Sequence, residues 1–123
     1  MSNYVAGSCN IGQAEIHQRY RVAIIGIVIY LAVSTYLVIT DAPTIDRLFI
    51  FFPAMAASVG YVQARKKFCL AYGYMGVFNF GKAGDTSAVK DPVALSADRK
   101  YATKVLLQSC IPAAVLTFVV TLF

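Results

Sequence analysis

The sequence predicts an all-α integral membrane protein with three transmembrane helices, arranged as a helical hairpin plus one further helix. The chain is 59% hydrophobic and only 14% charged, whereas soluble domains carry about 25% charged residues. Three runs, 22–40, 48–64 and 105–123, contain no Lys, Arg, His, Asp or Glu. All but one of the eleven Lys and Arg residues lie in only two of the segments that flank these runs.

The length of the uncharged runs matches a lipid bilayer. As helices that rise about 1.5 Å per residue, they reach roughly 25–29 Å, close to a hydrocarbon core of about 30 Å. We therefore expect helices at about 22–40, 47–64 and 103–122. The remaining residues are too few to cover three uniformly apolar helices, which disfavours a soluble all-α protein. The first run also exceeds the apolar stretch of about 7–15 residues of a cleaved signal peptide, so we expect it to be retained.

The uneven distribution of cations predicts the topology. Segments 1–21 and 65–104 hold all the Lys and Arg residues except Arg47, which shares the loop 41–47 with two aspartates. The positive-inside rule places the two basic segments in the cytoplasm. We expect a multi-pass protein of the inner (cytoplasmic) membrane, with a cytoplasmic N-terminus and the C-terminus outside. The expected parts are a cytoplasmic amphipathic lead-in (1–21), a transmembrane hairpin (22–64), a cytoplasmic basic and aromatic interfacial loop (65–102) and a third transmembrane helix (103–123).

The cytoplasmic loop combines cations with aromatic side chains. Its stretch 64–84 reads ARKKFCLAYGYMGVFNFGKAG, which suits the membrane–water interface, where aromatic rings gather. Each basic residue near anionic lipid contributes about 1 kcal/mol of binding. We expect contacts with anionic lipid on the cytoplasmic face from Arg65, Lys66, Lys67, Arg99 and Lys100. Because these cations flank apolar helices without any nucleic-acid-binding motif, we expect no nucleic acid as a partner.

Later in this loop, residues 81–91 are expected to form a flexible connector. Asp91 and Pro92 are suited to the N-cap and the first turn of a helix. The third helix is therefore expected to begin with a cytoplasmic extension.

Small residues recur at four-residue spacing in the second and third runs. Such stripes let helix backbones come close in lipid. We expect packing through Ala56, Gly60, Ala64, Ser109, Ala113 and Thr117, inside the protomer, and leftover small faces to serve a homo-oligomer or other membrane subunits. Pro53 and Pro112 each remove a backbone hydrogen bond and are expected to bend their helices. Gln108 and Ser109, beside the second bend, either satisfy the freed backbone or form a polar spot for a ligand or ion.

The ionisable and thiol groups limit the possible activities. A pump or ion-coupled transporter is disfavoured, because such proteins carry ionisable side chains within their spans. Cys9 and Cys69 are expected on the reducing side of the membrane, where a structural disulfide is not the default. Cys69 follows three cations, which would lower the pKa of its thiol if the sulfur faced water. Cys9, His17 and Cys69 could together hold a soft metal or haem, although the chain lacks the usual CxxC and HxxxH spacings.

Two stretches carry a resemblance to a known family. CNIGQAEIHQRYR precedes the first run, and SVGYVQARKKFCLAYGYMGVFN closes the second. Together, over residues of about 9–81, they resemble the small two-helix membrane domain found alone or in membrane-bound rhodaneses. The matching residues are Asn10, Gly12, Arg19 or Arg21, Phe68, Cys69, Tyr72 and Gly73. Leu70 replaces the proline usual after the cysteine, the third helix is extra, and no rhodanese active-site loop is present. The resemblance implies a membrane-anchoring, oligomerising module and an association with thiol chemistry.

Two functions follow as expectations. The first is a non-catalytic small inner-membrane protein, an accessory or scaffold subunit of a membrane complex or of a homo-oligomer. The alternative is a cytoplasm-facing thiol site, in which Cys69 with Cys9 carries persulfide, binds metal or haem, or exchanges disulfides. Lipid or quinone binding and a small homo-oligomeric channel also remain open, and the residues specify no particular cofactor.

Overall fold

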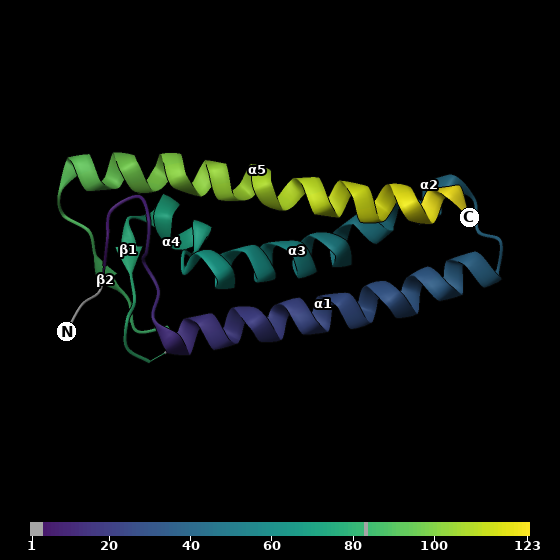
Figure 1. Cartoon of the computed structure of the whole chain (residues 1–123), viewed down its shortest axis with the longest axis horizontal. Helices are drawn as coiled ribbons and strands as arrows, with labels where there is room; N and C mark the ends of the chain where they lie inside the picture. The colour runs from purple at the N-terminus through teal and green to yellow at the C-terminus, as the bar shows by residue number, and fades with distance from the viewer. Residues whose placement is uncertain (1–3, 83) are drawn as a thin grey trace.

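Three long helices run side by side along one axis in the computed structural model, which describes residues 4–82 and 84–123 (Figure 1). They are α1 (Gln13–Ile39), α3 (Phe51–Lys66) and α5 (Pro92–Leu122). Two short helices, α2 (Thr44–Arg47) and the 3₁₀ helix η1 (Leu48–Ile50), precede α3. The prediction of three helices long and apolar enough to cross a membrane is confirmed, with bounds of Gln13–Ile39, Thr44–Lys66 and Pro92–Leu122.

Two of the helices begin earlier than the apolar runs. The expected lead-in 1–21 is not a separate element, because α1 already begins at Gln13 and continues without interruption. The predicted start of the third helix is confirmed at Asp91, whose Oδ1 accepts a hydrogen bond from the Val93 amide at 3.1 Å. Polar turns therefore extend both helices beyond their apolar parts.

The segment between α3 and α5 is more ordered than a loop. Lys67 adopts a left-handed conformation (φ 56°) and ends α3, and α4 (Leu70–Met75) follows. Strand β1 (Val77–Phe78) then pairs antiparallel with β2 (Ser87–Ala88). The expected connector 81–91 thus includes a strand, which sequence periodicity could not reveal in an element of two residues.

Helix α3 contacts both α1 and α5 through small residues. A Cβ atom added to Gly26 of α1 would lie 2.6 Å from the Ala57 amide nitrogen, and one added to Gly60 would lie 2.8 Å from the Ala23 nitrogen. Toward α5, Ser58 Oγ donates a hydrogen bond to the Ser109 carbonyl at 2.6 Å. Close backbone approach therefore determines the spacing between α1 and α3.

The predicted small-residue stripes are used within the protomer, against different neighbours. Gly60 faces α1 rather than the stripe of α5. The buried members are Gly60, Ala64, Ser109, Ala113 and Thr117, and Ala56 is half-buried. On α3 it is Ala54 that shares an apolar cluster with Ala113.

The two prolines have different positions. Pro53 lies in the first turn of α3, after η1, rather than in a helix interior, whereas Pro112 lies inside α5. The hydroxyl of Ser109 donates to the Val105 carbonyl at 2.8 Å and not to the carbonyl of Gln108. Gln108 Oε1 has no hydrogen-bond partner among the described residues. The Ser109 hydroxyl therefore does not bond the Gln108 carbonyl, which lacks its helical partner because Pro112 has no N–H.

Arg47 stabilises the end of the bundle that holds α2 and the C-terminus. Its side chain is buried and donates from Nε to the Ala42 carbonyl at 2.9 Å and from Nη1 to the Val120 carbonyl at 3.1 Å. Its Nη2 also lies 3.6 Å from Asp41 Oδ1. The last carbonyls of a helix have no partner within the helix and attract cations. Arg47 thus caps α5 instead of acting as a free surface charge.

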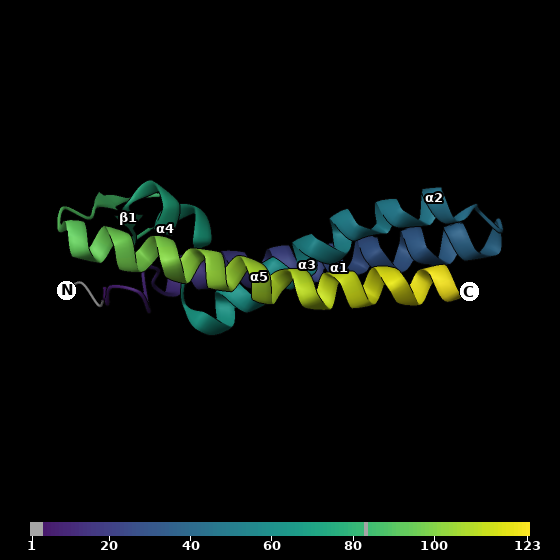
Figure 2. The same cartoon turned by 90° about the horizontal axis from the view of Figure 1, so that it is seen from above.

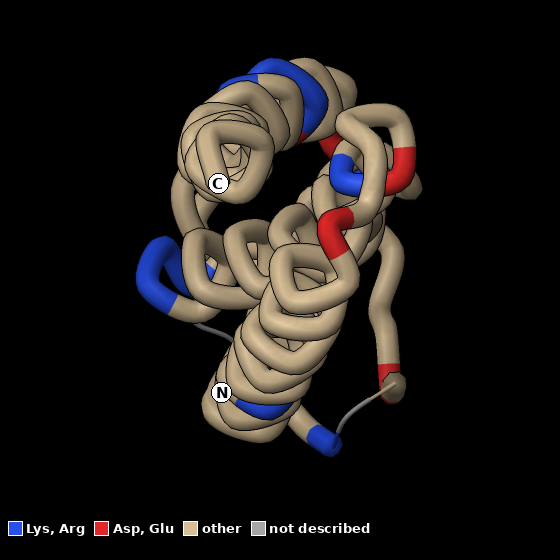
Figure 3. The backbone as a smooth tube through the Cα atoms, turned by 90° about the vertical axis from the view of Figure 1, so that its right-hand side faces the viewer, with Lys and Arg blue, Asp and Glu red and all other residues tan. Residues whose placement is uncertain are grey.

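The two ends of the bundle differ in charge. The described N-terminal residues, the end of α3 and the start of α5 lie at one end, while the C-terminus and α2 lie at the other (Figures 1 and 2). We call the first of these the basic end, because every Lys and Arg except Arg47 belongs to segments that lie toward it. Figure 3 looks along the bundle from the opposite end, where charged residues are few.

We predict that Gly26→Leu separates α1 from α3. A side chain at this position collides with the Ala57 backbone, which cannot move away as a flexible side chain could. Overpacking of this kind costs about 1–3 kcal/mol. Thermal unfolding in mild detergent should show a lower melting temperature than for Ala32→Leu, which adds a leucine to the same helix at an exposed position. Equal melting temperatures of the two variants would contradict this packing.

Candidate functional site

The described residues at the basic end include a cluster of buried and half-buried polar side chains that we call the polar cap. Its members come from the N-terminal segment, α1, the α3–α4 turn, α4 and the loop after β1. They are Asn10, Glu15, Arg19, Cys69, Tyr72 and Asn79. The polar cap thus joins segments that are distant in the sequence.

Asn10 attaches the N-terminal segment to the turn between α3 and α4. Its Nδ2 donates to the Cys69 carbonyl at 3.1 Å, and its Oδ1 accepts from the Cys69 amide at 2.7 Å. The backbone of Asn10 also bonds the carbonyl of Lys67 and the amide of Asn79. Asn10 is fully buried, so these bonds replace the water that its amide loses on folding.

Glu15 is the acidic centre of the polar cap, with an exposure of only 1%. Its Oε2 accepts hydrogen bonds from the Tyr72 hydroxyl, from Asn79 Nδ2 at 3.1 Å and from the Gly84 amide at 3.4 Å. Its Oε1 lies 3.3 Å from Arg19 Nη1. A buried carboxylate is tolerated only when such partners compensate for its lost hydration. Glu15 therefore holds the loop after β1 against α1 and α4.

Arg19 connects this carboxylate to the thiol of Cys69. Arg19 Nη2 lies 3.1 Å from Cys69 Sγ, and the guanidinium carbon lies 5.8 Å from the centre of the Tyr72 ring. Cys69 is only 2% exposed, so its sulfur does not face water, as it would have to in an activated thiol.

The protonation of two neighbouring groups follows from their burial. Burial, together with the hydrogen bond to Glu15, raises the pKa of Tyr72 to about 12. The phenol therefore stays neutral near pH 7 and acts as a donor to the carboxylate. Burial likewise raises the pKa of the Cys9 thiol, which makes Cys9 a weak nucleophile, because the thiolate is the reactive form.

A second buried acid, Asp98 of α5, holds the N-terminal segment from the other side. Its Oδ2 accepts from the Tyr4 hydroxyl at 2.5 Å, and its Oδ1 accepts from the Gly7 amide at 2.7 Å. Asp98 is fully buried. Nothing local in the sequence indicates this burial, because the partners of Asp98 are distant in the chain.

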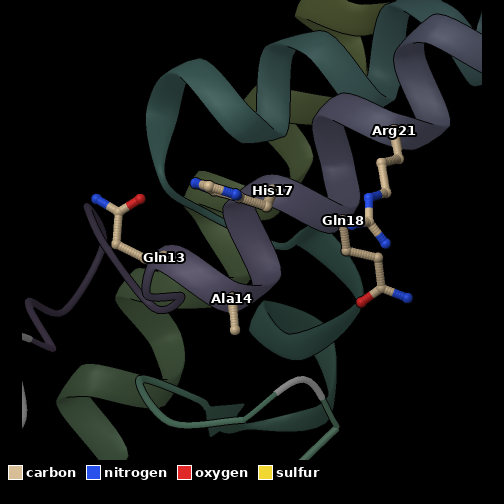
Figure 4. Close-up of a pocket in the computed structure, with 5 residues that line it drawn as sticks. All are labelled: Gln13, Ala14, His17, Gln18 and Arg21. Atoms are coloured by element: carbon tan, nitrogen blue, oxygen red, sulfur yellow. The ribbon is translucent and has the colours of Figure 1, made fainter.

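The structure does not bring the three proposed metal ligands together. His17 is exposed and lies on α1 beside a hollow of about 510 Å³, which Gln13, Ala14, Gln18 and Arg21 also line (Figure 4). Among the described residues, no group of three or more His, Cys, Asp or Glu side chains could hold a metal ion. The cysteines Cys9, Cys69 and Cys110 are all free. Of the expected lipid-contacting cations, Lys66 is half-buried, and the exposed ones are Arg65, Lys67, Arg99 and Lys100.

Most residues that carry the family resemblance meet at or beside the polar cap. Asn10, Cys69 and Tyr72 belong to it, and of the two candidate arginines it is Arg19 that does so. Beside it, a Cβ on Gly12 would lie 2.9 Å from Phe80, and one on Gly73 would lie 2.7 Å from Phe68. No protein-family model, curated protein or solved structure matches the chain, so the resemblance stays a prediction.

We predict that Asn10→Ala loosens the attachment of the N-terminal segment. The substitution leaves the buried amide and carbonyl of Cys69 without their partner, which costs about 1–3 kcal/mol of folding free energy. Hydrogen exchange and thermal unfolding should show the loss, whereas Gln18→Ala, which truncates an exposed amide of α1, should not. If both variants unfold at the wild-type temperature, the polar cap does not hold these segments together.

Proposed function

We propose that this chain is a three-span inner-membrane protein that acts as a non-catalytic accessory or scaffold subunit. It joins a larger membrane complex or a homo-oligomer, with its basic end and N-terminus in the cytoplasm and its C-terminus outside. The observation that carries the proposal is the uncovered apolar surface of α1, since only 11% of its most apolar 18-residue stretch is buried.

The exposed apolar surface of α1 is unfavourable in water, which supports a membrane environment. The exposed apolar side chains of α1 include Ile24, Ile25, Val28, Leu31 and Ile39. Soluble monomers rarely expose contiguous apolar patches larger than a few hundred Å². Lipid tails cover such a surface without cost, and the helical backbone satisfies its own hydrogen bonds there.

The three helices also leave lateral surface for other subunits. In the most apolar 18-residue stretches of Thr44–Lys66 and Pro92–Leu122, only 33% and 28% of the stretch, respectively, is buried. Neighbouring helices of a partner, or of a second copy, can pack on these faces in place of lipid. This supports a role in assembly.

The polar cap and the second buried acid, Asp98, support a structural role. Asn10, Glu15, Asn79 and Asp98 are each at most 1% exposed, and their side chains bond to the backbone or to one another. A catalytic group must touch its substrate, whereas these groups touch other parts of the same chain. We therefore assign them to holding the basic end together.

The proposal predicts stable membrane integration and assembly. Membranes washed with alkaline carbonate should retain the protein, because its apolar helices stay in the bilayer. After mild solubilisation, blue-native electrophoresis and affinity purification should show a homo-oligomer or defined membrane partners. Release by carbonate would refute membrane integration. A monomer that copurifies with no other protein would refute the scaffold role.

A second candidate is the thiol site, which the distance of 3.1 Å between Arg19 Nη2 and Cys69 Sγ favours. It predicts that maleimide modifies Cys69 in the folded protein and that Arg19→Gln changes the rate of this reaction, because the substitution removes the guanidinium beside the sulfur. Cys69→Ser identifies the modified residue, and metal analysis with a visible spectrum tests for a cofactor. An unreactive Cys69 in a colourless, metal-free protein would eliminate this candidate.

A further inference from the structure

An apolar hollow between α1 and α3 adjoins a cationic hollow near the end of α3, and we call the two together the groove. Its apolar part has a volume of about 310 Å³ and is lined by Tyr20, Ala23, Ile24, Ile27, Ala57 and Tyr61. An adjoining hollow of about 380 Å³ is lined by Tyr61, Val62, Arg65 and Lys66. Tyr61 lines both parts, so they adjoin at this residue.

Two tyrosines mark the boundary between the apolar and the cationic part. The rings of Tyr20 and Tyr61 meet edge to face with their centres 6.5 Å apart, and both side chains remain exposed, at 37% and 53%. Tyrosine rings favour the membrane–water interface, where one end is apolar and the other is hydrated. The boundary of the groove therefore coincides with a chemical boundary suited to a lipid headgroup region.

The cationic part has charge available for a ligand. Arg65 and Lys66 belong to the last turn of α3, and neither forms an ion pair with a described residue. Arginine and lysine both bind phosphate oxygens. A small soluble anion would occupy only the cationic hollow, whereas an amphipathic anion would also occupy the apolar hollow lined by Ala23 and Ile27.

We propose that this groove binds one anionic phospholipid, with its headgroup phosphate at Arg65 and Lys66 and one acyl chain along Ala23 and Ile27. The charge of the hollow selects an anionic headgroup, and its position next to the apolar part favours a lipid over a free phosphate. The inference rests on the proposed membrane location and adds a defined site to it. Bound lipid would cover part of the uncovered α1 surface next to α3.

The site predicts selective lipid retention in native mass spectrometry. Protein in mild detergent with equal phosphatidylglycerol and phosphatidylcholine should retain one phosphatidylglycerol per protomer, with a preference of about tenfold or more, as expected for two basic contacts. Arg65→Gln with Lys66→Gln should abolish this preference. Lys82→Gln with Lys90→Gln should keep it, because this pair removes the same charge from exposed positions that do not line the groove. Glycerol 3-phosphate should not displace the lipid.

Three results would overturn the lipid site. They are equal retention of the two lipids by the wild type, equal loss of preference in both double variants, and displacement by glycerol 3-phosphate. If any of these occurs while carbonate-washed membranes still retain the protein and its assembly is unchanged, only the lipid site fails. Release of the wild type by carbonate would refute both the lipid site and the proposed function.

Discussion

The arrangement of the bundle depends on the close contact of α3 with its two neighbours. Gly26 and Gly60 let α1 approach until a single added methyl group would collide with backbone atoms. On its other side, α3 donates the Ser58 hydroxyl to α5. Because small residues occupy both contacts, several larger apolar side chains of α1, such as Ile24, Ile25 and Val28, remain exposed. The same packing therefore explains the uncovered apolar surface and the groove beside Tyr20 and Tyr61.

The charged residues at the basic end of the bundle are of two kinds, those that bond to other groups of the chain and those that line an open surface. Glu15, Arg19 and Asp98 are engaged by other groups of the chain. Arg65 and Lys66, in contrast, line an open hollow at the end of α3. Charge that holds the fold together thus lies inside, while charge available to lipid or to a partner lies outside. This division favours a protein that binds its surroundings over one that transforms a substrate.

Sequence reasoning predicted the features that depend on local composition. The uncharged runs indicated three apolar helices, and Asp91 before Pro92 indicated where α5 begins. It did not predict that Glu15 and Asp98 would be buried, because their partners are distant in the chain and a polar residue does not reveal its tertiary contacts. The burial of Cys69 could not be predicted for the same reason, because the sequence left open whether its sulfur faces water.

The orientation of the bundle in the membrane is the central claim, and cysteine labelling tests it most directly. Asp46→Cys and Ser96→Cys place exposed thiols at opposite ends of the bundle, with the wild-type chain as the control for the native cysteines. A membrane-impermeant maleimide added to intact cells should modify Asp46→Cys at once and Ser96→Cys only after permeabilisation. Modification of Ser96→Cys in intact cells, or of both variants equally, would contradict the account.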